Sequence, residues 1–148
     1  MKKIGSWLGA IALIFAVKVG FRLMRAEVFD SDDGQAEWIQ EQDEWVSSEI
    51  GDGIASPARG WLSQGGHGTF EGDPARMDAL IGEFESNGAR VWMVGIEELG
   101  GRQISDSIAV ELPTDAGSRS QVFAVEAAYW QGDGTPDVGQ SYLVVSFD

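Results

Sequence analysis

The hydrophobic pattern of the chain begins with a long apolar stretch. Ile4 to Val17 form a continuous apolar run, and with residues 19–24 the stretch reaches about 21 residues, enough for a helix to cross a bilayer. No small-x-small cleavage site follows, so we predict an uncleaved anchor and not a removed signal peptide. Residues 1–25 are therefore the predicted transmembrane anchor, and residues 4–24 are predicted to contact membrane lipid.

Basic residues follow at the end of this stretch. Lys18, Arg22 and Arg25 are spaced i, i+4 and i+7, which places them on one face of the continuing helix. We interpret them as a basic stripe at the membrane edge, whose long side chains reach the headgroups, with docking of a partner as the alternative. Lys2, Lys3 and the α-amino group balance them, so the positive-inside rule leaves the side of the soluble part undecided.

A second pattern, typical of an amphipathic helix, spans about residues 35–50 after a polar hinge at 27–34. Its apolar stripe consists of Trp38, Ile39, Trp45, Val46 and Ile50, and acidic residues occupy its other faces. The sequence Gly51-Asp52-Gly53 ends the helix. Residues 54–66 are rich in Gly, Ser and Pro, which predicts a loop with Trp61 and Leu62 tucked in.

From residue 67 the pattern predicts strands and helices in the order βαββαβ. The strands are expected at 67–71, 90–98, 104–112 and 141–147, with a hairpin turn at Gly100-Gly101. One helix starts at Pro74 after an Asp73 N-cap and ends at Asn87-Gly88, and another runs from about 115 to 130. The expected buried residues include Leu80, Phe84, Ile108, Val110, Val125 and Val145.

This order predicts an α+β fold, namely a ferredoxin-like βαββαβ domain at residues 67–148. It is preceded by the acidic amphipathic helix and loop at residues 26–66 and by the transmembrane helix. Both helices of the domain are expected on one face of a four-stranded antiparallel sheet. The other face needs cover from the 35–50 helix, from a partner or from a second copy of the chain.

Charge narrows the choice of partners. Residues 26–148 hold all 24 acidic residues of the chain against five arginines, a net charge of −19. Phosphates are repelled by such a domain, so we predict no direct binding of nucleic acid. The same field attracts a basic partner, although solubility alone also explains it. The absence of cysteine excludes disulfides, thiol catalysis and thiolate metal sites.

The layout resembles the regulator of ribonuclease activity B family, which comprises bacterial inhibitors of ribonuclease E. The matching stretches are Gly68-Thr69-Phe70-Glu71-Gly72-Asp73, Glu85-Ser86-Asn87-Gly88 and Arg90-Val91-Trp92. The family's Tyr-Asp-Gly-Trp near the last strand is replaced here by Pro136-Asp137-Val138-Gly139. The resemblance implies the same βαββαβ domain after a leading acidic helix, and a location at a bacterial inner membrane as a single-pass relative.

Residues with catalytic or metal-binding chemistry are few. His67 is the single histidine and lies between glycines, but no pattern orients it toward Ser63 as in a Ser-His-Asp triad. Asp133 to Asp137, and Asp30 and Asp32 with Glu41, match calcium loops only in part, and turn chemistry explains them as well. Glu71 and the pair Glu97-Glu98 are expected to be surface charges at strand ends. We therefore predict no enzyme activity, no cofactor and no metal site.

The expected function is that of a non-catalytic, membrane-anchored, acidic protein-interaction or regulatory module. Trp38 and Trp45 are the predicted partner-binding anchors, and Glu37, Glu41 and Glu44 are predicted to steer a basic partner toward them. The alternative is that both indoles cover the domain's own sheet. Two alternative functions, both narrower, are a ribonuclease E inhibitor-like regulator on the cytoplasmic face and an accessory subunit of a membrane or secretion complex. The partner's identity and the formation of a homo-oligomer stay open.

Overall fold

The computed structural model describes residues 32–68, 74–132 and 134–147. The predicted anchor, with its basic stripe of Lys18, Arg22 and Arg25, lies outside the described residues. Within those residues, no helix has the length and apolar character needed to cross a membrane. The chain divides into two compact units, residues 1–39 and residues 40–148, and each is described by itself.

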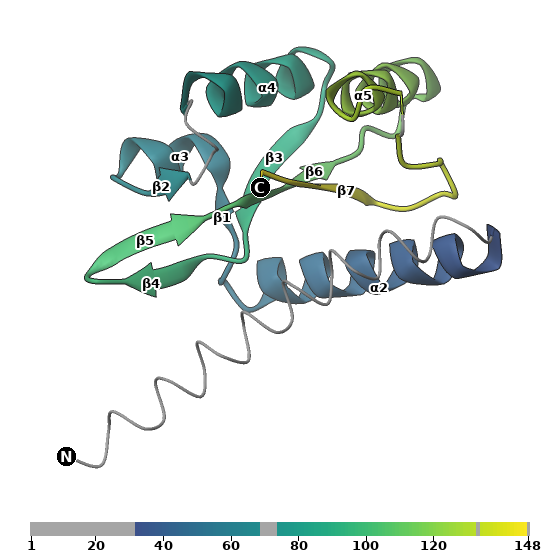
Figure 1. Ribbon diagram of the computed structural model, residues 1–148. Coiled ribbons are helices and arrows are strands. Elements are labelled where there is room, and N and C mark those ends of the chain that lie inside the picture. Colours follow the sequence, from purple (N-terminus) through teal and green to yellow (C-terminus); the bar gives the residue numbers. More distant parts are fainter. Residues whose placement is uncertain (1–31, 69–73, 133, 148) are drawn as a thin grey trace. The chain divides into compact units, whose positions relative to one another are not determined.

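The described elements are helices and short strands, with β3 to β6 consecutive between α4 and α5 (Figure 1). The helices are α2 (Asp32–Gly51), α3 (Ala58–Ser63), α4 (Pro74–Ser86) and α5 (Ala116–Tyr129). The strands are β1 (Ser56–Pro57), β2 (His67–Gly68), β3 (Arg90–Val94), β4 (Glu97–Leu99), β5 (Arg102–Ser105), β6 (Ser107–Glu111) and β7 (Tyr142–Ser146). This composition confirms the α+β class.

The strands form two sheets. The larger has the order β1-β3-β6-β7 and is antiparallel throughout, with Val91 opposite Val110 and Val110 opposite Leu143. The smaller has the order β2-β5-β4, in which β2 is parallel to β5. The predicted hairpin turn is confirmed, because Leu99 pairs with Arg102 and both Gly100 and Gly101 have positive φ.

Each of the two long strands expected at 90–98 and 104–112 is broken in the middle. Gly95 has a φ of +60°, a left-handed conformation that ends β3 before β4 begins. Opposite this point, the Ser105 hydroxyl donates to the Val94 carbonyl at 2.5 Å and accepts from the Ser107 N–H at 3.2 Å. These side-chain bonds replace ladder bonds at the break, and the continuous strands that were predicted are wrong for this reason.

The strand order also differs from a ferredoxin-like sheet, in which the first strand lies between the third and the last. Here β7 pairs directly with β6, and β2 pairs with β5 beyond the break in the strand. Residues 69–71, the remainder of the expected first strand, lie outside the described residues. The described part thus has the predicted order of elements along the chain without the ferredoxin-like pairing.

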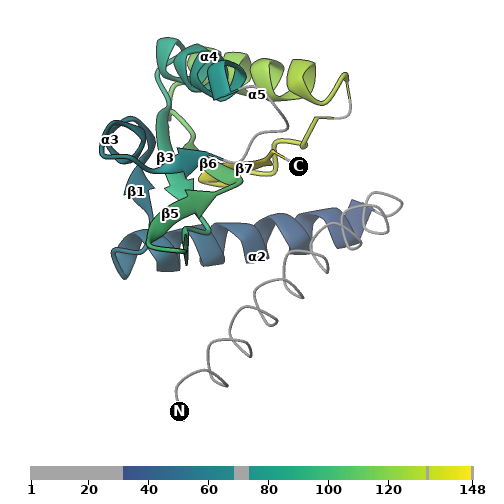
Figure 2. The same ribbon diagram turned by 60° about the vertical axis from the view of Figure 1, so that its left-hand side comes forward.

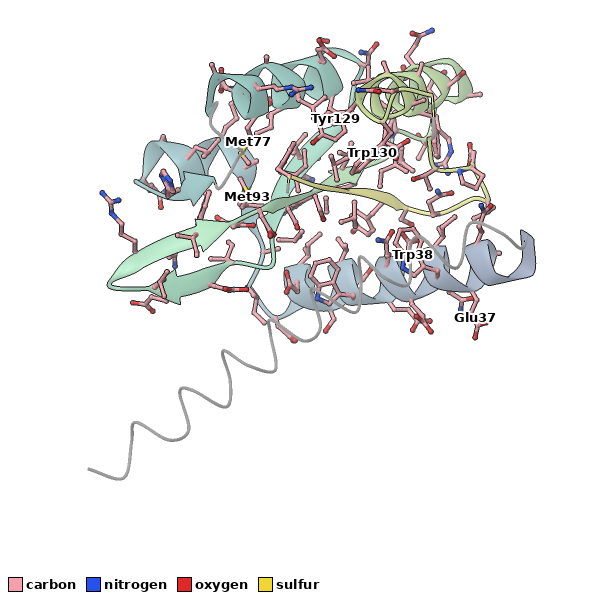
Figure 3. The ribbon with its side chains drawn as sticks, in the orientation of Figure 1. Glu37, Trp38, Met77, Met93, Tyr129 and Trp130 are labelled. Carbon is pink, nitrogen blue, oxygen red and sulfur yellow. The ribbon has the colours of Figure 1, made fainter. Side chains whose placement is uncertain are left out.

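One face of the larger sheet is covered by α4 and α5, as predicted (Figure 2). Met77, Leu80, Ile81 and Phe84 form the buried stripe of α4, and Val122 is the buried apolar residue of α5. They pack with strand residues such as Met93, Val110 and Val145. Met77 of α4 and Met93 of β3, both members of this cluster, are labelled in Figure 3. Of the six residues expected to be buried, five are, and Val125 is half-buried because it packs at the margin of this core.

The other face of the larger sheet is covered by the part of α2 that begins at Gln40. Val46 is fully buried there with Val94 and Ala109, and Trp45 and Ile50 pack against the same cluster. The cover for this face therefore comes from the chain's own helix, one of the three alternatives that the pattern left open.

The predicted loop at 54–66 contains two regular elements, β1 and α3. Ser56 and Pro57 pair with Met93 and Trp92, so this segment shares the sheet of the 67–148 domain. Trp61 is buried on α3, and its indole N–H donates to the Gln103 side chain at 2.9 Å. A Cβ on Gly66 would come within 2.2–2.5 Å of the indole ring, so glycine is required where the chain crosses it.

Candidate functional site

The outer face of α2 carries exposed acidic side chains. Glu41 and Glu44 are exposed, and the Gln40 amide donates to the Glu44 carboxylate at 3.3 Å across one helical turn. Glu37 is also exposed and belongs to the first compact unit. All three residues predicted to steer a basic partner are thus exposed to solvent.

The two tryptophans predicted as partner anchors are not freely exposed. Trp45 is half-buried and packs against the cluster of Val46, Val94 and Ala109. Trp38 is buried, with 8% of its surface exposed, and belongs to the first unit. For Trp45 the geometry favours the alternative that the indole covers the domain's own sheet.

Two carboxylates on the inner side of α2 hold the sheet. Asp43 accepts from the backbone N–H groups of Ser141 at 2.7 Å and Tyr142 at 2.9 Å, where β7 begins. Glu49 accepts from the Gly95 N–H at 2.9 Å. Burial raises the pKa of the Glu49 carboxyl, and the bonds from Gly95 and the Trp45 side chain act in the opposite direction. Asp43 therefore binds N–H groups at the start of β7, and Glu49 binds the N–H of Gly95 between β3 and β4.

Glu49 is expected to make stability depend on pH. Because its pKa is higher in the folded chain, its contribution to stability is fully present below the unfolded pKa of about 4.3 and is lost as the pH rises through the folded pKa. Replacing Glu49 by Gln keeps an acceptor for the Gly95 N–H and removes the titration.

Urea unfolding of both proteins between about pH 3.5 and pH 7 measures this effect. The stability of the original protein relative to Glu49→Gln should fall as the pH rises. Glu44→Gln, which removes an exposed carboxylate from the same helix, is the matched control. A difference that stays constant, or that grows with pH, would contradict the assignment.

The loop after α5 is held by polar contacts. Arg119 forms a bidentate ion pair with Asp137, with N–O distances of 2.8 and 2.7 Å. It also donates to the Gln140 carbonyl at 2.8 Å. Its hydrogen bonds lower the pKa of Asp137. Glu126 is fully buried and accepts from the Thr135 N–H at 2.9 Å and the Thr135 hydroxyl at 2.7 Å.

These contacts bear on the calcium loop considered at residues 133–137. Asp133 lies outside the described residues, Thr135 is bound to Glu126, and Asp137 is bound to Arg119. Among the described residues, no group of three or more acidic or histidine side chains has an arrangement suited to a metal ion. Thr135 and Asp137 are thus both bound by side chains of α5.

The remaining candidates are separate from one another. His67 is exposed on β2, and the Ser63 hydroxyl donates to the Gly60 carbonyl at 2.8 Å inside its own helix. Glu98 is exposed on β4, and Glu97 is partly buried beside it. β5 lies between β2 and β4 in the sheet, so His67 and the two glutamates are not on neighbouring strands.

Four of the five arginines in residues 26–148 contact neighbouring side chains. Arg59 pairs with Asp78 at 2.5 Å and Glu85 at 2.8 Å, and Arg119 pairs with Asp137. Arg76 lies over the Tyr129 ring and Arg90 over the Trp92 ring, 5.9 and 5.3 Å from the ring centres. The positive charge of the domain is thus dispersed and bound, while most of its negative charge faces solvent.

Sequence reasoning missed the roles of Asp43, Glu49 and Glu126. All three occur in helical patterns where an acidic residue ordinarily faces solvent. For Glu126 the sequence did contain one indication of burial, because it lies four residues after Val122 and hence on the buried stripe of α5.

Comparison with protein-family models, with curated proteins and with solved structures finds no match to this chain. The resemblance to the ribonuclease E inhibitors stays a prediction.

Proposed function

We propose that this chain is a non-catalytic protein-interaction module that is anchored in a bacterial inner membrane through residues 4–24 and binds a basic partner protein. The observation that carries the proposal is the separation of charge in the domain. Glu41 and Glu44 are exposed on a helix, whereas four arginines are held by the domain's own acids and rings. A basic protein surface is the complement of such a face.

The packing of α2 changes how recognition is expected to work. Because Trp45 contacts the sheet, the inner side of the helix is committed to the fold. Recognition is therefore assigned to the acidic outer face, with Glu41 and Glu44 as its central residues. Steering by these charges raises the association rate and weakens with salt.

Photo-crosslinking of the full-length chain in membranes tests the proposal. A photoreactive residue at position 41 or 44 is expected to crosslink a basic protein, which mass spectrometry then identifies. The crosslink should weaken in about 0.5 M salt, where the screening length falls below about 5 Å. The double variant Glu41→Lys with Glu44→Lys carries its photoreactive residue at position 48 instead, because Ser48 is exposed one turn further along α2. This variant should no longer capture the basic protein that the same probe captures when Glu41 and Glu44 are present.

The matched control is a photoreactive residue at Glu83, an exposed acid on α4, across the sheet from α2. Equal capture from position 83, or capture of lipid alone from 41 and 44, would overturn the proposal. The identity of the captured protein separates the narrower functions: ribonuclease E would indicate the regulator, and a subunit of a membrane assembly would indicate the accessory role.

A further inference from the structure

An open hollow lies beside the β4–β5 hairpin. It encloses about 260 Å³ and is bordered by Gly53 and Ile54, which follow α2, and by Ile96, Glu97, Glu98 and Gln103 of the hairpin region. Figure 1 shows this hairpin extending from the side of the domain. The hollow thus combines one apolar wall with two carboxylates.

The edge of β4 that borders the hollow has backbone groups available for pairing. In a two-residue hairpin, the residues next to the turn exchange hydrogen bonds, so the N–H and C=O groups of Leu99 and Glu97 face β5. Those of Glu98 consequently face away from β5, and Ile96 directly precedes the strand. β4 is the edge of its sheet, and none of the described strands pairs with that side.

The two edges of the larger sheet are protected, in contrast to β4. β1 consists of two residues, and one of them, Pro57, lacks an N–H group. On β7, the Tyr142 N–H is bound by the Asp43 carboxylate. Short edges, proline and charged groups at an edge are means by which proteins prevent pairing with other strands. The β4 edge has a carboxylate at Glu98 but no proline and no such cap.

Exposed apolar side chains gather near the same edge. Among the described residues, three large hydrophobic side chains are exposed, and two of them belong to this region: Leu99 at 59% and Ile54 at 49%. Leu99 follows Glu98 directly, and Ile54 lines the hollow. An unpaired strand edge with apolar and acidic side chains is suited to an extended segment that is both apolar and basic.

We propose that an extended segment of a partner protein, containing lysine or arginine, adds to β4 as a further strand and places a basic side chain in the hollow. The inference rests on the proposed function and names the mode of recognition. The outward-facing backbone groups of Glu98 bind the segment, and the exposed Glu98 carboxylate receives its charge. A second copy of β4 is disfavoured, because self-pairing about Glu98 sets the Glu98 carboxylates of both copies against each other.

A synthetic peptide of alternating valine and lysine, seven residues long, is the probe for this edge. It is titrated into the ¹⁵N-labelled full-length chain in detergent micelles. The amide signals of Ile96 and Glu98 are expected to shift, with binding that weakens as salt rises. A peptide with glutamate in place of lysine should leave the same signals unchanged, because its charge is repelled.

Two variants at Glu98 separate backbone pairing from charge. Glu98→Pro removes an outward-facing N–H without removing a ladder bond to β5, and it should weaken peptide binding at least about tenfold. Glu98→Lys reverses an exposed charge and should weaken the lysine peptide while allowing the glutamate peptide to bind. This exchange of preference keeps the inference testable if the proline variant does not fold.

Unchanged binding in both variants would overturn the inference. So would peptide-induced shifts confined to Glu41 and Glu44 on α2, and in that case the proposed function still stands, because the acidic outer face would be the site. Failure of the membrane crosslinking, with β4 shifts present, would instead remove the proposed partner and leave the strand edge as a peptide site.

Discussion

Replacing Phe84 by alanine is expected to lower the free energy of unfolding by about 3–5 kcal/mol. The Phe84 ring has no exposed surface and lies in the core between α4 and the larger sheet, with Ile81, Val110 and Val122 in the same cluster. Removal of the ring loses the free energy gained by its burial and leaves a cavity in a packed core. Urea unfolding of the full-length chain in micelles, followed by tryptophan fluorescence, measures the change.

Glu83→Ala is the control for Phe84. Glu83 is adjacent on α4 but exposed, so its side chain contributes little and the change should stay within about 0.5 kcal/mol. A loss below about 1 kcal/mol for Phe84→Ala would show that α4 does not bury this face as described.

Replacing Glu126 by alanine is expected to cost about 3 kcal/mol or more. Its carboxylate is fully buried and accepts from both the N–H and the hydroxyl of Thr135. The loop lies close against α5 at Gly134, because a Cβ there would come within 2.7 Å of the Ala127 Cβ and 3.1 Å of the Glu126 carboxylate. Alanine at 126 therefore leaves donors without an acceptor in a place that the loop covers.

Three further variants apportion this loss. Glu126→Gln keeps the shape and one acceptor oxygen, so it should cost less than alanine. Thr135→Val removes the hydroxyl bond alone and should cost about 1 kcal/mol. The double variant Glu126→Ala with Thr135→Val should cost less than the sum of the single changes, because the two groups bind each other. Additive losses would show that Glu126 acts through other contacts.

Local chemistry was sufficient to predict several elements. The stripe Met77, Leu80, Ile81 and Phe84 follows the helical period, and all four residues are buried on α4. The sequence offers Thr114 or Asp115 as the N-cap of α5, and it is the Asp115 carboxylate that accepts from the Ser118 N–H at 2.8 Å. The glycine pair at 100–101 permits the positive φ values of a tight hairpin. Such features depend on neighbours within about four residues, so their physical cause is present in the sequence itself.

Features that depend on distant residues were decided by the tertiary structure. Asp43 binds backbone groups 98 and 99 residues further along the chain, which no helical period indicates. The break at Gly95 depends on the Ser105 hydroxyl across the hairpin and on Glu49 from another element. The sheet order was predicted from the order of elements alone, and pairing of β7 with β6 replaced the expected arrangement.

The same division holds for the candidate site. The sequence determined that the chain is strongly acidic, that its leading helix carries Glu37, Glu41 and Glu44, and that its tryptophans lie on one stripe of that helix. An exposed indole and a buried one have the same sequence pattern, because periodicity defines a face and not what the face contacts. Only the tertiary structure placed Trp45 on the sheet and left the edge of β4 open beside exposed Leu99.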